Sequence, residues 1–65
     1  MQILLNGEAH ATDAKTLGDL CAQLGFSEAK IATAVNGRFV AAVARGVVEL
    51  APADEIEIVA PRQGG

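Results

Sequence analysis

The segment TLGDLCAQLG, residues 16–25, predicts the main helix of this chain. Thr16 can cap the N-terminus, and Asp19 places a carboxylate in the first turn, where the helix dipole favours negative charge. Gly25 is expected to end the helix in the left-handed conformation, so that Phe26 can fold back onto the last turn. One apolar stripe runs along it at i, i+3, i+4 and i+7: Leu17, Leu20, Cys21 and Leu24. A helix over 17–24 with a single stripe can cover only one face of a sheet, which predicts a two-layer α+β domain.

Strand patterns lie on both sides of this helix. Two hairpins are predicted, each around an Asn-Gly pair that is typical of a type I′ turn. Their paired strands are residues 2–5 with 8–12, and residues 31–35 with 38–43. Residues 55–58 alternate glutamate and isoleucine, so both isoleucines share one face of a final strand. Residues 45–50 fit either a short strand or a loop.

The order of these elements predicts the topology of the sheet. The helix provides a crossover long enough to bring a later strand parallel to the first strand, along the right-handed route. The sequence therefore predicts a β-grasp roll, with a mixed sheet of four to five strands and one main helix packed on one face. A length of 65 residues suits a single domain over residues 1–65.

The composition argues against several classes of protein. With 51% hydrophobic and 20% charged residues, the chain is expected to fold. Eight acidic residues against five basic ones, with two Phe and no Trp or Tyr, argue against nucleic-acid binding. One cysteine and one histidine cannot form a structural zinc site. Because no apolar run could span a membrane and a free thiol occurs without an export signal, we expect a cytoplasmic protein.

No residue pattern indicates an active site. His10 is predicted to be a solvated residue of the second strand, on one face with Glu8 and Thr12 and with no catalytic partner nearby. Cys21 is predicted to be a small buried residue of the helix stripe. Ser27 follows the end of the helix, outside any strained nucleophile turn. We therefore expect no enzyme, with no catalytic residue, no metal site and no bound cofactor.

The closing residues are the one place where we expect chemistry. They read Ala60-Pro61-Arg62-Gln63-Gly64-Gly65 and form the predicted flexible tail, residues 60–65. Pro61 cannot extend a strand ladder, so the chain is expected to leave the sheet there. Five residues beyond Ala60 can reach about 17 Å, far enough for the Gly65 carboxylate to enter a partner's active site. Glycine has no Cβ, so the final pair fits a narrow channel and leaves the terminal carbonyl open to attack.

Four segments of the sequence resemble the ThiS family, the sulfur carriers of thiamine (thiazole) biosynthesis, which are ubiquitin-like β-grasp proteins. They are MQILLNG (1–7), AVNG (34–37), DEIEIV (54–59) and APRQGG (60–65), of which the last two are the most specific. The resemblance covers the full length. The sequence departs from the family at Ala53, where glycine is common, and at residues 41–44, where Ala-Ala-Val-Ala replaces Pro-Arg and aromatic features.

The resemblance implies a carrier that other proteins load and unload. An E1-like adenylyltransferase (ThiF-like) would use MgATP to convert the Gly65 carboxylate into an acyl adenylate. Sulfur from a cysteine desulfurase or another donor would then give a thiocarboxylate, which a thiazole synthase (ThiG-like) would accept. Gly64, Gln63 and Arg62 would give the tail access to these partners. The free carrier is expected to be a monomer that binds no cofactor, because ATP and magnesium would belong to the activating enzyme.

The open sheet face beside the tail is predicted to dock these partners. The predicted contact residues are Leu4, Phe39, Val40, Glu57 and Val59. The acidic cluster of Asp54, Glu55 and Glu57 fits either a solvated face or a docking surface for a basic partner.

Three other functions stay open at this point. The carrier could supply sulfur for molybdopterin, cysteine, methionine or a secondary metabolite. It could also be a ubiquitin-like modifier that is joined to lysine side chains, or an interaction domain with an inert tail. The fate of the activated tail separates these functions, because a sulfur carrier keeps a thiocarboxylate whereas a modifier forms conjugates of higher mass.

Overall fold

The computed structural model describes residues 1–26 and 30–60, which form one mixed sheet and two helical segments. The strands are β1 (Gln2–Leu5), β2 (Glu8–Ala11), β3 (Ala32–Val35), β4 (Arg38–Val40) and β5 (Glu55–Val59). The helices are the α-helix α1 (Leu17–Gln23) and the short 3-10 helix η1 (Ala42–Val47). The strand order is β2-β1-β5-β3-β4, in which β1 and β5 are parallel and the three other neighbouring pairs are antiparallel.

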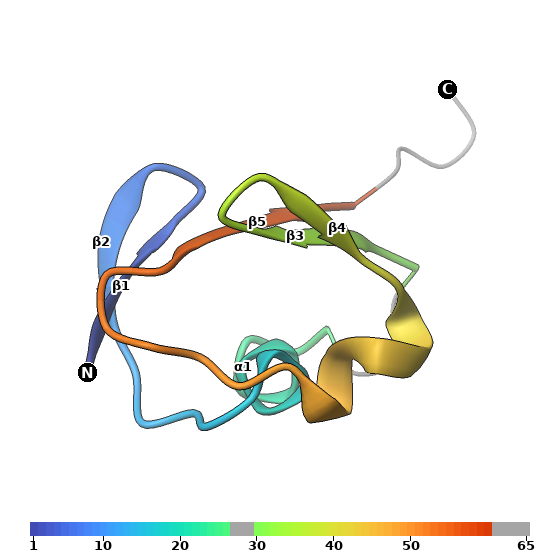
Figure 1. Ribbon diagram of the computed structural model, residues 1–65, viewed down its shortest axis with the longest axis horizontal. Helices are drawn as coiled ribbons and strands as arrows, with labels where there is room; N and C mark the ends of the chain where they lie inside the picture. Colours follow the sequence, from blue (N-terminus) through green and yellow to red (C-terminus); the bar gives the residue numbers. More distant parts are fainter. Residues whose placement is uncertain (27–29, 61–65) are drawn as a thin grey trace.

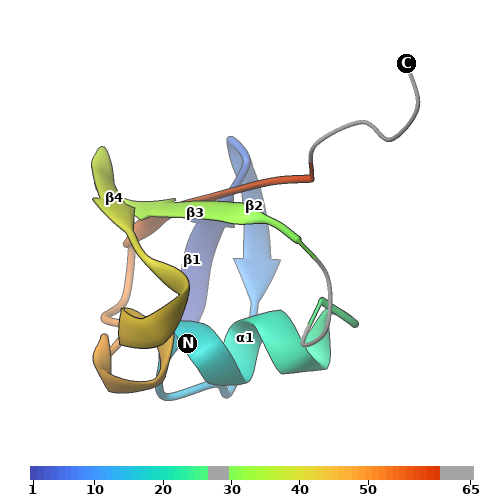
Figure 2. The same ribbon diagram turned by 90° about the vertical axis from the view of Figure 1, so that its right-hand side faces the viewer.

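Helix α1 lies across one face of this sheet (Figures 1 and 2). It follows the β1–β2 hairpin in the chain, and β5 later returns to pair with β1 at the centre of the sheet. The predicted β-grasp roll is confirmed, with five strands and one main helix on one face.

Both ends of α1 are capped as the sequence predicts. The Thr16 hydroxyl accepts a hydrogen bond from the backbone N–H of Asp19 at 3.1 Å. At the other end Gly25 has φ +85°, and the N–H groups of Gly25 and Phe26 donate to carbonyls in the last turn at 3.1 and 2.8 Å. This is a Schellman motif, and Phe26 packs against the core as expected.

The chain after β4 differs from the prediction. The expected strand over 38–43 is shorter, and η1 takes up the residues that follow it. Arg45 explains the change, because its Nε donates to the Thr33 hydroxyl at 2.9 Å and its Nη2 donates to the Ile31 carbonyl at 2.7 Å. These bonds tie η1 to β3, so the chain turns away from the sheet edge instead of extending β4.

Helix η1 and the residues after it pack beside α1. Gly18 faces Gly46 so closely that a Cβ on Gly18 would lie 3.2 Å from the Gly46 Cα atom. The backbone N–H of Leu17 then donates to the Val48 carbonyl at 2.9 Å. The segment 45–50, which the sequence left open, is therefore part 3-10 helix and part backbone support for the start of α1.

The core lies between α1 and the inner face of the sheet, meaning the face that α1 covers. Ile56 and Ile58 both point into it, as the alternation in the final strand predicts. Its buried apolar residues are Ile3, Ala14, Leu17, Leu20, Cys21, Val40, Ile56 and Ile58. The helix stripe thus meets the inner residues of β1, β4 and β5, which buries the apolar surface that stabilises this small domain.

His10 of strand β2 points toward the inner face of the sheet, contrary to the prediction of a solvated histidine. His10 pairs with Ile3, which is only 1% exposed, so His10 lies on the inner face and is half-buried. Thr12 is buried beside it, where its hydroxyl donates to the Gln23 side chain at 2.9 Å. The pairing register with β1 determines which residues of β2 face inward. The small alanines of β2, Ala9 and Ala11, are exposed.

Cys21 is buried on α1, as predicted. Burial raises the pKa of its thiol, and the nearby Arg45 guanidinium offsets part of that effect. The folded protein therefore favours the neutral thiol over the thiolate.

The turn before β5 contains a strained alanine. Ala53 has φ +71°, in the left-handed region where a Cβ is unfavourable. The turn holds this conformation because the Ala53 N–H donates to the Gln2 carbonyl at 2.8 Å and the Asp54 N–H donates to the Ala51 carbonyl at 3.1 Å. Ala53 is one of the positions where the sequence departs from the family pattern.

Replacing Ala53 with glycine is expected to stabilise the protein. Relief of the left-handed conformation is worth about 1–2 kcal/mol, which exceeds the added freedom of the unfolded chain, about 0.5–1 kcal/mol. A net gain of about 1 kcal/mol should raise the Tm by about 4–8 °C. Ala51→Gly is the matched control in the same turn, and it should lower the Tm slightly because it adds chain freedom alone. Equal losses in both variants would contradict the strain at Ala53.

The raised thiol pKa predicts a loss of stability at alkaline pH. A group whose pKa is higher in the folded state contributes stability below its ordinary pKa, here 9.0, and that contribution is lost as the pH rises through the folded-state pKa. Urea unfolding between about pH 7 and about pH 10.5 should show this decline in the wild type. Cys21→Ala should show a smaller decline, and the difference between the two curves isolates the thiol. Parallel curves would contradict the prediction.

Candidate functional site

The sheet has an outer face on the side away from α1 (Figure 2). This face carries most of the predicted docking residues. Successive strand residues point to opposite faces, so the neighbours of the inward-facing isoleucines point outward. The predicted residues on this face are Leu4 of β1, Phe39 of β4, and Glu57 and Val59 of β5. Phe39 is 74% exposed and Val59 is 62% exposed, so two large apolar side chains of the sheet lie outside the core and face solvent.

Two shallow hollows follow β5 across the outer face. Ala34 pairs with Phe39 on one side and Glu57 on the other, and its small side chain leaves a hollow of about 170 Å³. A second hollow of about 250 Å³ lies between the two hairpin turns. Its lining residues are Leu4, Gly7, Gly37, Glu55, Ile56 and Glu57. The outer face thus offers apolar surface along the strand that leads to the tail.

Val40 does not belong to this face. It pairs with the buried Thr33 and is only 8% exposed, inside the core. The prediction that Val40 contacts a partner is therefore wrong. Phe39 and Val40 are neighbours in one strand and cannot both point outward, and the register of β4 places Phe39 outside.

The tail itself follows β5. Gly65, the predicted sulfur-carrying residue, and the access residues Gly64, Gln63 and Arg62 lie outside the described residues. The strand that leads to them is central in the sheet, with β1 on one side and β3 on the other. The base of the site is β5 with its neighbours β1 and β3.

Two asparagine side chains hold β5 near its ends. The Asn36 Oδ1 atom accepts from the Glu55 N–H at 2.9 Å, and Nδ2 donates to the Asp54 carboxylate at 3.0 Å. The Asn6 Oδ1 atom accepts from the Ile58 N–H at 2.9 Å, and Nδ2 donates to the Ile58 carbonyl at 3.2 Å. Both asparagines have a positive φ, near +50°, in the turns of the two hairpins.

Sequence reasoning identified these asparagines only as turn residues. One feature of the sequence does indicate a further role: both hairpins use asparagine at a turn position where aspartate or glycine would also be suitable. Of these three residues, only asparagine has both a hydrogen-bond donor and an acceptor in its side chain at neutral pH.

The acidic cluster does not act as a unit. The Asp54 carboxylate is occupied within its own turn, where it accepts from Asn36 and from the Ala51 N–H at 2.8 Å. Glu55 and Glu57 instead are exposed on the outer face. Two carboxylates therefore border the apolar residues of the outer face, and the third stabilises the turn before β5.

Among the residues that the structure describes, the other reactive side chains are not assembled into a catalytic site. His10 lies on β2, and the Cys21 thiol is buried with a raised pKa. Ser27 lies outside the described residues. Within residues 1–26 and 30–60 no three His, Cys, Asp or Glu side chains are grouped to hold a metal ion. In the same part of the chain, no helix is long and apolar enough to cross a membrane.

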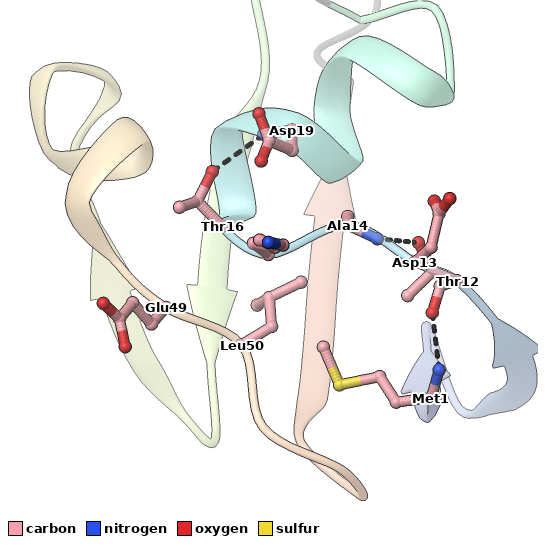
Figure 3. Close-up of a pocket in the computed structure, with 9 residues that line it drawn as sticks. Met1, Thr12, Asp13, Ala14, Thr16, Asp19, Glu49 and Leu50 are labelled. Carbon is pink, nitrogen blue, oxygen red and sulfur yellow. Dashed lines mark hydrogen bonds between the residues drawn. The ribbon is translucent and has the colours of Figure 1, made fainter.

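A larger hollow, of about 710 Å³, lies beside the start of α1 (Figure 3). Its polar groups bond to one another: the Met1 ammonium donates to the Thr12 carbonyl at 2.7 Å, and the Ala14 N–H donates to the Thr12 hydroxyl at 3.0 Å. These bonds fix the loop between β2 and α1. The hollow holds no pair of nucleophile and base. The start of α1, which borders it, lies away from the end of β5 (Figures 1 and 2).

Comparison with known proteins agrees with the β-grasp fold described above. The structure is similar to that of a thiamine biosynthesis protein (ThiS) from Geobacter metallireducens, with a TM-score of 0.83 and 20% sequence identity over 100% of each chain. A search of curated proteins found no match. A family model described as the ThiS family matches residues 3–65, from β1 through the last residue of the tail. This chain therefore belongs to the ThiS family of thiamine biosynthesis, whose members are sulfur carriers and not enzymes.

Proposed function

We propose that this chain carries sulfur to the thiazole of thiamine as a thiocarboxylate on Gly65. The observation that carries the proposal is the family match over residues 3–65, which includes the Gly64-Gly65 pair. The outer face supports it, because exposed apolar residues lie next to the strand that leads to the tail.

The chemistry proceeds in three steps on the Gly65 carboxylate. An oxygen of the carboxylate attacks the α-phosphorus of MgATP on an E1-like, ThiF-like enzyme, and pyrophosphate leaves. A sulfur nucleophile, either hydrosulfide or the persulfide of a cysteine desulfurase, then adds to the acyl carbon and AMP leaves. With a persulfide the product is an acyl disulfide, which a thiol reduces to the thiocarboxylate. A ThiG-like thiazole synthase takes the sulfur from the thiocarboxylate, and an oxygen from water or from the sulfur acceptor takes its place, which restores the carboxylate. The carrier contributes an accessible acid, and the partner enzymes contribute the catalysis.

The tail and the outer face have separate tasks in this proposal. Gly64 and Gly65 lack Cβ atoms and can pass through a narrow channel, with Gln63 and Arg62 extending the reach. Leu4, Phe39 and Val59 supply apolar contact area for the partner, while the body of the carrier stays outside the active site. Glu57 adds a carboxylate among these residues that a basic side chain of the partner can pair with.

Mass spectrometry of the intact protein tests the chemistry directly. Incubation with the adenylyltransferase, MgATP and a sulfur source is expected to produce a mass gain equal to one oxygen replaced by sulfur, localised to Gly65. The variant that lacks Gly64 and Gly65 should keep the fold by circular dichroism and gain no mass. Conjugates of higher mass, joined to lysines of other proteins, would instead identify a protein modifier. A truncated variant that retains full activity would identify an interaction domain.

Replacing Phe39 with alanine tests the docking face. Because Phe39 is 74% exposed, the fold should tolerate the change, whereas an aromatic anchor at an interface contributes about 1–2 kcal/mol. The KM of the adenylyltransferase for this carrier should therefore rise by roughly tenfold at an unchanged kcat. Val43→Ala is the matched control, because Val43 is 95% exposed on η1, away from the outer face. An equal effect of both substitutions on the KM would argue against docking through the outer face.

A further inference from the structure

The end of β5 depends on one side chain for its hydrogen bonds toward β1. The two strands pair at Leu4 with Glu55 and at Leu5 with Ile56. The Asn6 backbone N–H donates to the Ile56 carbonyl at 2.8 Å, and the chain then turns away into the hairpin. Past this point β1 offers no further backbone group to β5.

Ile58 lies beyond the reach of the β1 backbone. Alternate residues of a strand direct their peptide groups to the same side, so the N–H and carbonyl of Ile58 point to the same side as the Ile56 carbonyl, toward Asn6. The Asn6 amide occupies this position and satisfies both groups, at 2.9 and 3.2 Å. A single side chain thus replaces the next residue of the ladder.

We infer that Asn6 is a positioning residue for the sulfur-carrying tail. The inference rests on the function proposed above. Ile58 is followed by Val59 and Ala60, and then by the tail, so the Asn6 amide fixes the last part of the sheet from which the tail leaves. Without it, β3 alone would hold the end of β5 through its pairs with Ile58 and Val59.

Positioning of the tail by Asn6 affects kcat, whereas docking through the outer face affects the KM. The outer face sets how tightly the carrier binds its partner, whereas the fixed base of the tail sets how often the bound carrier presents Gly65 in a reactive geometry. A loosened base lowers the fraction of productive complexes, which lowers kcat and leaves the KM nearly unchanged.

The second hairpin provides a matched control. Asn36 occupies the same turn position with nearly the same φ, +51° against +50°, and its side chain also bonds to β5. Its contact is with Glu55, at the end of β5 that is remote from the tail. Glycine tolerates a positive φ, so Asn6→Gly and Asn36→Gly each remove a side chain without straining the turn.

The test compares these two variants at a temperature where both are folded by circular dichroism. Pyrophosphate release in the presence of the adenylyltransferase, MgATP and a sulfur source gives kcat and KM, and hydrogen exchange followed by NMR reports on single amides. Asn6→Gly should lower kcat by roughly tenfold with the KM within about twofold, and should speed exchange of the Ile58 amide by about tenfold. Asn36→Gly should speed exchange at Glu55 and leave kcat unchanged.

Each contrary outcome has a distinct meaning. If the wild type turns over normally and Asn6→Gly keeps its kcat, the positioning role of Asn6 is overturned while the proposed function stands. Equal losses of kcat in both variants also overturn it, because they would reflect general destabilisation. If the adenylyltransferase does not activate the wild type, the proposed function fails and the role of Asn6 in the reaction fails with it.

Discussion

The parallel pairing of β1 with β5 holds the sheet together, because it joins two hairpins that share no strand. One half of the sheet is β2 with β1, and the other is β5 with β3 and β4. The seam between them contains few backbone bonds, including those from the Leu4 N–H to the Asp54 carbonyl at 2.9 Å and from the Asn6 N–H to the Ile56 carbonyl at 2.8 Å. The Asn6 side chain lengthens this seam by bonding to Ile58.

The inner face of the sheet holds the core, and the outer face is the proposed docking surface. On the inner face, α1 and the isoleucines of β5 form the core. The Schellman motif ends α1, and the close approach of Gly18 to Gly46 packs the helix against η1. On the outer face, small alanines on β3 leave the side chains of Phe39 and Val59 accessible. Substitutions on the outer face should therefore have little effect on folding, whereas substitutions on the inner face act first on folding.

The elements with strong local patterns were predictable from the sequence. The caps of α1, both Asn-Gly turns and the alternation of β5 follow from residues close in the chain, and together they predict the roll. The segment after β4 was not predictable, because η1 depends on bonds from Arg45 to residues of and beside β3.

The same limit applies to the strand faces and to the candidate site. The faces of His10 and Val40 depend on pairing register, which a strand's own composition does not fix. For the site, the outward direction of Leu4, Phe39 and Val59 agrees with the prediction, whereas that of Val40 does not. The bonds from the turn asparagines to β5 were not predictable, because they join groups up to 52 residues apart.

The central place of β5 also determines the order in which the protein can assemble. Each hairpin is made of neighbouring residues and can form within microseconds of its synthesis. The seam between the hairpins must wait for residues 55–59, and closing so long a loop is the slow step of such a topology. We therefore expect the strand that leads to Gly64 and Gly65 to enter the sheet last, so that a chain with β5 in place has completed its fold.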